Sequence, residues 1–321
     1  MNETTPYPVS SLKFWAAYII QMRPYLLFVS GIAGALGIAM SASAATPAWK
    51  IIAAFIPFFL GYGFGQALTD CFQTDTDKLS APYRPLSKGS ITIRSVLVVS
   101  LTGLTLSGVL LFLLHPLSLV LCLLSIFGLA TYSYIKKNCW YGGPFYNAWI
   151  VALLPVMGYI AVLHSSLINF PVVLYSSVPV TFFSYANFVL IGYLKDIEAD
   201  KATGYKTFPV VFGWNKTMLL GDFFALITLL FYWYNADKNW YEIIAGSAAT
   251  AILLTGQIKG HLSKTTNEKA ALIPILCTVR GFILLHIAVI LRYQPSCWPI
   301  LLLYYILFET ALYLRPSKYQ V

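Results

Sequence analysis

Half of the acidic residues in this 321-residue chain fall in two short stretches, each of which directly follows a long apolar segment. Of the twelve acidic residues, the first stretch holds Asp70, Asp75 and Asp77, and the second holds Asp196, Glu198 and Asp200. Carboxylates near a membrane boundary are unfavourable, and neighbouring like charges repel one another. Clusters of this kind are typical of a site that binds a cation.

Helical spacing predicts which side chains of the first stretch converge. At about 100° per residue, Asp70, Gln73 and Asp77 share one face, provided that the helix continues through the stretch. Asp75 then lies on the far side. We therefore expect Asp70, Gln73 and Asp77 to face a cavity.

In the second stretch, Asp196 and Asp200 are one helical turn apart and share a face, while Glu198 points away. Two facing carboxylate pairs suit Mg²⁺, which prefers oxygen ligands and usually bridges to substrate phosphates. The basic residues near both stretches are candidates for gripping a phosphate group. They are Arg84, Lys88, Lys136, Lys195 and Lys201.

The elements that position these residues are predicted to be membrane helices. The chain is 58% hydrophobic and only 10% charged, whereas soluble domains carry about 25% charged residues. We expect one all-α transmembrane domain over residues 1–321, with a polar segment at 1–14. Ten apolar stretches are long enough to span a membrane: 16–44, 49–70, 92–115, 117–136, 145–166, 171–195, 214–234, 240–259, 270–292 and 297–314.

Lysine and arginine are concentrated in alternate loops, including both loops that carry the acidic stretches. The opposite loops contain only Lys50, Lys238 and Arg292. The positive-inside rule places the basic loops, the acidic stretches and both termini in the cytoplasm, and we expect an integral protein of an inner or plasma membrane. The net charge of +9 is therefore explained by topology, and we infer no nucleic-acid partner.

Several segments together resemble the UbiA superfamily of intramembrane prenyltransferases. That family carries N-D-x-x-D-x-x-x-D after its second helix, followed by a P-Y-R-P-like segment, and D-x-x-x-D after its sixth helix. The corresponding segments here are TDCFQTDTD at Thr69–Asp77, PYRP at Pro82–Pro85 and DIEAD at Asp196–Asp200. KTFPVVFG at 206–213, ATYSYIKK at 130–137 and MRPYLLFVSGIAG at 22–34 are also similar to family segments.

The resemblance implies nine transmembrane helices around a central cavity, with 297–314 as an extra tenth helix. It implies Mg²⁺ as the cofactor, Asp70, Asp77, Asp196 and Asp200 as the catalytic acids, and Arg23 as a further diphosphate-binding residue. Two positions depart from the family motif: Thr69 replaces its asparagine and Gln73 its middle aspartate. Gln73 offers a metal an oxygen without charge, and Asp75 can compensate if the helix unwinds there.

The activity implied by the resemblance is Mg²⁺-dependent transfer of an isoprenyl group from an isoprenyl diphosphate to an aromatic or lipid acceptor in the membrane. Loss of diphosphate leaves an allylic carbocation, which aromatic ring faces stabilise by about 0.5–2 kcal/mol each. Candidate rings near the cytoplasmic helix ends are those of Tyr62, Tyr132, Tyr134, Tyr185 and Tyr193.

Two alternatives remain open from the sequence. A UbiA-type terpene cyclase would capture the carbocation within the same isoprenoid chain. A transporter or lipid-binding protein would explain the many helices and the intramembrane residues Arg23, Arg280 and His286. For Arg280 we favour a structural ion pair, with Asp222 as the candidate partner, over a position that faces the cavity and contacts substrate.

Overall fold

The computed structural model describes residues 5–163, 172–237, 239–263 and 268–316, and these residues form thirteen α-helices and two short 3₁₀ turns. The helices are α1 Leu12–Gln21, α2 Pro24–Ser41, α3 Ala48–Asp70, α4 Thr74–Ser80, α5 Ile93–Leu114, α6 Ser118–Asn138, α7 Gly142–Val162, α8 Val172–Gly192, α9 Ile197–Ala202, α10 Phe208–Tyr234, α11 Trp240–His261, α12 Glu268–Tyr293 and α13 Trp298–Tyr313. The turns are η1 Tyr193–Lys195 and η2 Pro295–Cys297.

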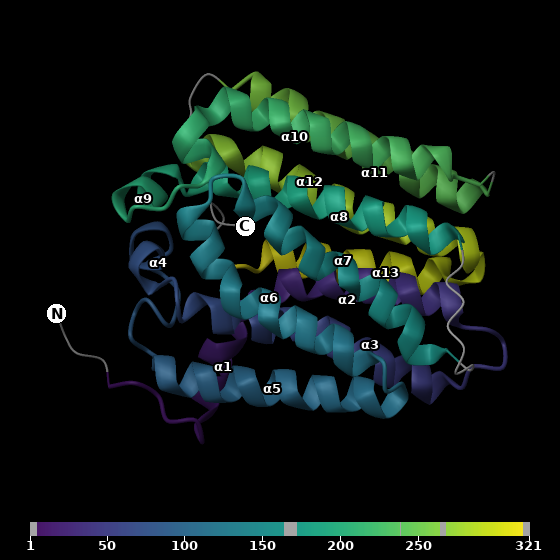
Figure 1. Cartoon of the computed structure of the whole chain (residues 1–321), viewed down its shortest axis with the longest axis horizontal. Coiled ribbons are helices and arrows are strands. Elements are labelled where there is room, and N and C mark those ends of the chain that lie inside the picture. Colours follow the sequence, from purple (N-terminus) through teal and green to yellow (C-terminus); the bar gives the residue numbers. More distant parts are fainter. Residues whose placement is uncertain (1–4, 164–171, 238, 264–267, 317–321) are drawn as a thin grey trace.

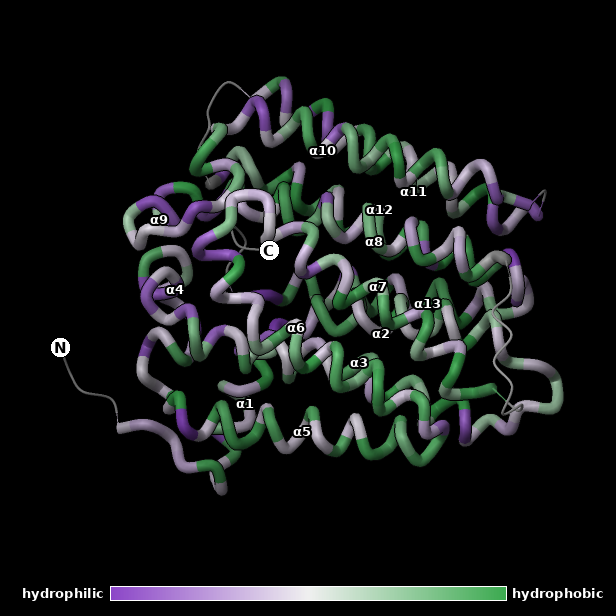
Figure 2. The backbone as a smooth tube through the Cα atoms, in the orientation of Figure 1, coloured by the Kyte–Doolittle hydropathy of each residue, from purple (hydrophilic) through white to green (hydrophobic). Residues whose placement is uncertain are grey.

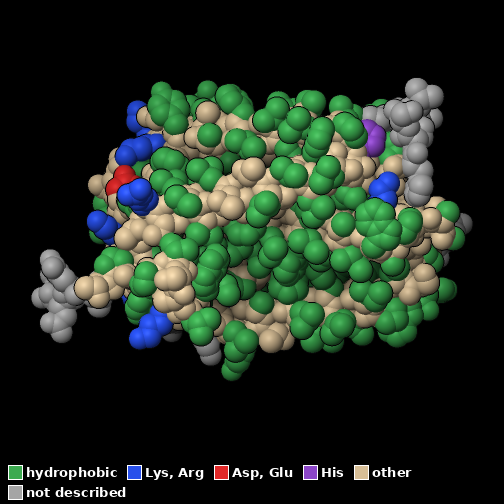
Figure 3. Space-filling view, turned by 90° about the horizontal axis from the view of Figure 1, so that it is seen from below, with side chains coloured by type: hydrophobic (Ala, Val, Ile, Leu, Met, Phe, Trp, Pro, Cys, Tyr) green, Lys and Arg blue, Asp and Glu red, His purple; other side chains and the backbone are tan. Residues whose placement is uncertain are grey.

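Ten of these helices are long and apolar enough to cross a membrane, which confirms the ten predicted spans. They run side by side in one bundle, with the short helices α4 and α9 next to each other at one end (Figure 1). The long helices are mainly hydrophobic, whereas α4 and α9 are largely hydrophilic (Figure 2). In Figure 3 hydrophobic side chains cover the middle of the visible face, and most of its lysine and arginine side chains gather at one end.

Helices α2, α7, α8 and α12 form the centre of the bundle, and α5, α6 and α13 lie at its edge. Helices α2 and α7 approach closely because both carry glycine at their contact. A Cβ atom on Gly37 would lie 2.6 Å from the backbone nitrogen of Tyr159, and one on Gly158 would lie 2.2 Å from the carbonyl oxygen of Gly34. Small residues at such crossings let membrane helices pack backbone to backbone.

The first predicted span, 16–44, is in fact two helices. Helix α1 ends at Gln21, and α2 begins at Pro24. Arg23 lies between them in a left-handed conformation (φ 55°). Proline disfavours a helical conformation in the residue before it, so the chain turns at this point. Helix α1 exposes Leu12 and buries Phe14 and Gln21, as expected for a helix in the membrane interface.

Pairs of oppositely charged or titratable side chains join the later helices. Arg280 on α12 does not pair with Asp222 as predicted; its Nε and Nη2 atoms each lie 2.7 Å from a carboxylate oxygen of Glu309 on α13. Asp222 instead lies 2.6 Å from His261. At the end of the bundle opposite α4 and α9, Arg292 Nε donates to the fully buried Glu242 at 2.9 Å. The expectation of a structural ion pair at Arg280 is therefore met by a different acid.

Candidate active site

Both acidic stretches lie at helix breaks at the same end of the bundle. Helix α3 ends at Asp70, and α4 begins at Thr74, so the condition that one helix continues through Asp77 is not met. Asp196 lies between η1 and α9. Because α4 packs against α9, the two stretches face one another across a polar pocket. Polar residues of this pocket are Arg23, Gln66, Asp70, Gln73, Asp77, Arg84, Asn147, Lys136, Lys195 and Asp196.

Asp70 is held by four side chains. Its Oδ1 atom accepts hydrogen bonds from Arg23 Nη2 at 2.8 Å and from Gln66 Nε2 at 2.8 Å. Its Oδ2 atom accepts one from Gln21 Nε2 at 2.6 Å and lies 3.8 Å from Arg84 Nη1. Asp70 is 2% exposed, so these contacts compensate for the burial of its charge.

Asp77 lies closer to Arg84 than Asp70 does, with 2.7 Å between Asp77 Oδ2 and Arg84 Nη1. Burial raises the pKa of Asp77 above its ordinary value, although Arg84 opposes this shift. Burial alone would lower the pKa of Arg84, but Asp77 and Asp70 outweigh it and raise that pKa, so the guanidinium group stays charged. Arg84 thus carries a permanent positive charge between the carboxylates of Asp70 and Asp77.

Gln73 lines the pocket, as predicted. Its Nε2 atom donates to Ser133 Oγ at 3.0 Å, and its Oε1 atom accepts from Lys136 Nζ at 3.4 Å. Lys136 also lies 3.6 Å from Asp200 Oδ1 and over the ring of Tyr205. The ammonium group of Lys136 therefore links Gln73 of the first stretch to Asp200 of the second.

The two aspartates of the second stretch differ in environment. Asp196 lines the pocket, and its buried Oδ1 atom has no hydrogen-bond partner among the described residues. Asp200 is fully buried behind the pocket, where Thr207 and Thr76 donate to its carboxylate at 3.2 and 3.4 Å. Burial raises the pKa of Asp200, and Lys136 and both threonines oppose the shift. The prediction that Asp196 and Asp200 both face the cavity is therefore wrong for Asp200.

Besides Asp200, four predicted site residues lie outside the pocket. Asp75 is on the outer side of α4, where its Oδ2 atom pairs with Lys137 Nζ at 3.2 Å. Partial burial acts to raise the pKa of Asp75, but the Thr76 N–H group and Lys137 outweigh it and lower the pKa. Lys88, Lys201 and Tyr134 are exposed. Asp75 therefore does not replace the missing middle aspartate, although the helix does break nearby.

Four tyrosines line the pocket in two hydrogen-bonded pairs. The hydroxyl groups of Tyr62 and Tyr185 are 2.6 Å apart, and those of Tyr132 and Tyr193 are 2.9 Å apart. Because the hydroxyl groups bond to each other, the polar ends of these side chains are satisfied within the protein. This arrangement suits a transient cation.

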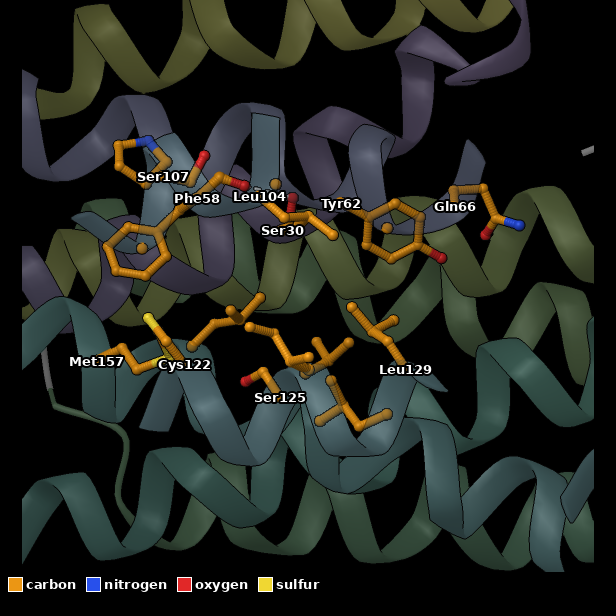
Figure 4. Close-up of a pocket in the computed structure, with 18 of the residues that line it drawn as sticks. Ser30, Phe58, Tyr62, Gln66, Leu104, Ser107, Cys122, Ser125, Leu129 and Met157 are labelled. Atoms are coloured by element: carbon orange, nitrogen blue, oxygen red, sulfur yellow. Dashed lines mark hydrogen bonds between the residues drawn. The ribbon is translucent and has the colours of Figure 1, made fainter. Parts of the chain in front are cut away.

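A second, largely apolar pocket adjoins the polar one. The two share Tyr62, Gln66, Tyr132 and Asn147. Helices α3 and α5 form one side of the apolar pocket, and α6 and α7 form the other. Phe58 and Tyr62 border the first side, and Cys122 and Leu129 border the second (Figure 4). From Tyr132 to Cys122 it follows ten residues of α6, about 15 Å of helix. A ligand with a charged head and an apolar tail fits the two pockets together.

The donor set fits a divalent metal only in part. Asp77 and Asp196 offer carboxylate oxygens from opposite sides of the pocket, and one oxygen of Asp196 is buried without a partner. Within the described residues, no group of three or more His, Cys, Asp or Glu side chains is arranged to hold a metal ion. This fits Mg²⁺, which commonly takes one or two carboxylates and completes its shell with phosphate and water.

Several residues of the site were not predicted. Gln21 on α1 donates to Asp70 and accepts from the Leu86 N–H group at 3.2 Å, so it ties α1 to both. Gln66 lies one turn before Asp70 on α3, a spacing that would have identified it. Ser133 and Thr207 reach the site from α6 and from the residue that precedes α10.

The structure combines a bundle of membrane helices, two acidic segments beside a pocket with several cations, and an adjoining apolar pocket. These features are typical of an intramembrane enzyme that acts on amphipathic phosphates. Residues 27–283 match the model of the UbiA prenyltransferase family, which spans most of the chain. The protein belongs to this family: it is an integral membrane enzyme of the UbiA prenyltransferase type. The resemblance drawn from the sequence motifs is confirmed.

Curated relatives include digeranylgeranylglyceryl phosphate synthases from three archaea. The protein from Thermococcus kodakarensis is 27% identical over 214 residues, covering 67% of this chain and 75% of the relative. The protein from Pyrococcus horikoshii is 23% identical over 214 residues, with the same coverage of 67% and 75%. The protein from Methanosphaera stadtmanae is 26% identical over 235 residues, covering 71% of this chain and 82% of the relative.

Solved structures show the same fold. A UbiA homologue from Archaeoglobus fulgidus bound to DMAPP and Mg²⁺ has a TM-score of 0.64 at 18% identity, covering 84% of this chain and 98% of that chain. An apo UbiA homologue from Aeropyrum pernix also has a TM-score of 0.64 at 15% identity, with coverages of 79% and 94%. The predicted UbiA-like bundle is therefore confirmed.

Proposed function

We propose that this enzyme transfers an isoprenyl group from an isoprenyl diphosphate to the hydroxyl group of a glycerol phosphate lipid, with Mg²⁺ as cofactor. The observation that carries the proposal is the junction of the two pockets at Tyr62, Gln66, Tyr132 and Asn147. It matches a diphosphate head joined to an apolar tail. The names of the relatives favour a phospholipid-like acceptor over an aromatic one and over the terpene cyclase alternative.

In this proposal Arg23, Arg84, Lys136 and Lys195 bind the diphosphate. Negative charge grows on the bridging oxygen as the carbon–oxygen bond breaks, so cations that contact it stabilise the transition state more than the ground state. A bound Mg²⁺ would add Lewis-acid stabilisation of the same charge. The catalytic acids Asp70, Asp77, Asp196 and Asp200 hold these cations in place.

The allylic cation forms where the polar pocket, which takes the diphosphate head, meets the apolar pocket, which takes the isoprenyl tail. Tyr62 and Tyr132 line both pockets, and Tyr185 and Tyr193 line the polar pocket. Rings that turn a face toward the cation would contribute cation–π stabilisation. The acceptor hydroxyl group then forms the new carbon–oxygen bond and releases its proton. The end of the bundle that holds the polar pocket also carries most of the basic loops, so we place this end and both termini in the cytoplasm. Residues 1–321 act as one domain.

The direct test uses the purified full-length protein in detergent or bilayers with Mg²⁺. Isoprenyl diphosphates of different lengths are supplied with a prenylated glycerol phosphate, with an aromatic acceptor, or with no acceptor. The proposal expects an ether product only with the glycerol phosphate lipid, together with release of diphosphate. A prenylated aromatic product would reassign the acceptor, and a cyclic hydrocarbon formed without acceptor would overturn the transferase assignment.

Gly108→Leu is expected to shorten the preferred donor. Gly108 lines the apolar pocket from α5, and a Cβ atom there meets no other atom within 4 Å, so a side chain would enter empty space. We expect the turnover of geranylgeranyl relative to geranyl diphosphate to fall by about 10-fold or more, as for other changes in apolar pocket size. Thr105→Leu, on the exposed side of α5, is the control. If Gly108→Leu and Thr105→Leu give the same turnover ratio of geranylgeranyl to geranyl diphosphate, this pocket does not bind the tail of the donor.

Gln73→Asp is expected to keep activity and to lower the Mg²⁺ concentration needed for half-maximal rate by several-fold, because ligand charge strengthens metal binding. Lys136, which already contacts Gln73, balances the added charge, and Ser133, whose hydroxyl oxygen accepts from the Gln73 amide, can instead donate its hydroxyl proton to a carboxylate. The measurement is a Mg²⁺ titration of the initial rate, with Asp75→Asn as the control outside the pocket. A folded but inactive variant would show that the amide serves something other than the metal.

A further inference from the structure

Four residues line both pockets and therefore lie nearest to the carbon that joins the diphosphate head of the donor to its tail. They are Tyr62, Gln66, Tyr132 and Asn147. In the proposed reaction this carbon loses the diphosphate and gains the oxygen of the acceptor. A side chain that orients the acceptor hydroxyl group at this carbon is therefore expected among the four.

Three of the four are fixed by strong hydrogen bonds to other residues of the polar pocket. Gln66 Nε2 donates to Asp70 Oδ1 at 2.8 Å, so this side chain supports the part of the site that takes the diphosphate. Tyr62 and Tyr132 each share a hydroxyl hydrogen bond with another tyrosine of the pocket, at 2.6 and 2.9 Å. These three side chains hold the walls of the pocket in place.

Asn147 is half-buried, and its side chain interacts with the hydroxyl group of Tyr132. A carboxamide has an oxygen that accepts hydrogen bonds and a nitrogen that donates two of them. One contact therefore leaves the Asn147 amide with capacity to bind a further polar group.

Asn147 is also the polar exception on one face of α7. One turn before it, Gly143 lies so close to Tyr193 that a Cβ atom there would clash with the tyrosine hydroxyl group. Three and seven residues after it, Ile150 and Leu154 line the apolar pocket. Residues at these spacings share a helix face, so one face of α7 passes from the tyrosines of the polar pocket to the tail pocket. A polar side chain on such a face inside a membrane is unfavourable and is typical of a functional contact.

We infer that the Asn147 carboxamide binds the hydroxyl group of the acceptor and orients its oxygen toward the reacting carbon. The inference rests on the proposed function and deepens it. The hydroxyl oxygen supplies the electron pair of the new carbon–oxygen bond, and the bridging oxygen of the diphosphate keeps the pair of the bond that breaks. The hydroxyl proton passes to the released diphosphate. Asn147 accepts a hydrogen bond from the hydroxyl group but takes no proton, because a neutral amide is a very weak base.

An amide suits this position because it orients a hydroxyl group without competing with it. A carboxylate or an amine beside the allylic cation is a nucleophile and could itself capture the cation. An amide also adds no charge next to the site where the cation forms. Orientation matters because a misplacement of about 1 Å can lower a rate on the order of 10²-fold.

The test combines removal of the amide with removal of the acceptor hydroxyl group. The lipids are a prenylated glycerol phosphate and an analogue in which hydrogen replaces its free hydroxyl group. Their binding to the purified full-length protein is measured with Mg²⁺ and inorganic diphosphate, so that no transfer occurs. We expect the wild type to bind the analogue about 3- to 10-fold more weakly than the parent lipid, the usual effect of one hydrogen bond. Asn147→Leu should bind both lipids equally.

The kinetic measurement uses geranylgeranyl diphosphate as the donor. Asn147→Leu should lower kcat for ether formation on the order of 10²-fold and change the KM of the donor by less than about twofold, because only the acceptor is misplaced. Asn138→Leu makes the same change at the exposed end of α6 and is the matched control. If leucine is not accommodated at position 147, Asn147→Ala removes the same amide with a smaller side chain.

An equal loss of affinity for the analogue in the wild type and in Asn147→Leu would overturn the inference. A raised KM for the donor with unchanged affinity for the acceptor would also overturn it, and would place the amide on the diphosphate instead. The proposed function would survive either result, provided that the wild-type enzyme forms the ether product. A wild-type enzyme that forms no ether would instead overturn the proposed function.

Discussion

Replacing Asp196 with asparagine is expected to lower the rate of prenyl transfer on the order of 10³-fold, at the upper end of effects seen when one stabilising group is removed from a polar site. Asparagine keeps the shape of the side chain but removes its negative charge. The affected oxygen, Asp196 Oδ1, is the one that is buried at the pocket without a partner. The loss should appear in kcat at saturating donor, acceptor and Mg²⁺.

Glu198→Gln is the control for this experiment. Glu198 lies two residues farther along the chain, on the exposed side of α9. Its substitution by glutamine removes one negative charge from the same segment, as Asp196→Asn does. It should change the rate by less than about twofold, because exposed charges interact weakly through water. An Asp196→Asn enzyme that folds and retains full activity would remove Asp196 from the catalytic centre and would require another ligand for the metal.

The largest loss of stability is expected from Arg292→Leu. Arg292 on α12 donates to Glu242 on α11, whose side chain is fully buried, and its guanidinium group lies 5.9 Å from the centre of the Tyr232 ring. Removing one partner leaves a buried charge without compensation, which costs about 3–5 kcal/mol. The thermal unfolding midpoint in detergent should fall clearly below that of the wild type.

The double variant Glu242→Gln with Arg292→Leu separates the loss of the pair from the creation of an unpaired charge. Replacing both charges in a buried pair is often close to neutral. The double variant should therefore recover most of the midpoint lost by Arg292→Leu alone. Equal midpoints for the single variant and the wild type would mean that this pair contributes little to the stability of the bundle.

Hydropathy was sufficient to predict the ten spans because each is long and almost free of charge. It missed the break between α1 and α2, since the apolar residues on either side of Arg23 and Pro24 form one continuous stretch. The helical spacing of the first acidic stretch assumed a helix that continues past Asp70, whereas the chain turns there before α4 begins. Average hydrophobicity contains no information about where a helix ends and the next one begins.

The charged site residues were only partly predictable, and several neutral ones, such as Gln21 and Gln66, were not predicted. Arg23, Arg84, Lys136 and Lys195 line the pocket as expected. Lys88 and Lys201 are just as close to the motifs in sequence but are exposed, because proximity along the chain does not determine the direction of a side chain. Whether each carboxylate binds a fixed cation or remains available depends on contacts between helices far apart in the sequence.

The amide of Gln21 gives no signal of its own, since glutamine is common on any polar surface. Its importance comes from reaching both Asp70 and the backbone of Leu86, which are 49 and 65 residues away. A similar limit applied to Arg280: an acid partner was expected, but the sequence could not select Glu309 over Asp222.

The pair of Arg280 and Glu309 also has a consequence for biosynthesis. Glu309 is made 29 residues after Arg280, so α12 emerges from the ribosome with a guanidinium group whose acid partner does not yet exist. Such a group is unfavourable in lipid until its partner arrives. We therefore expect α12 and α13 to enter the membrane more favourably as a pair than α12 does alone.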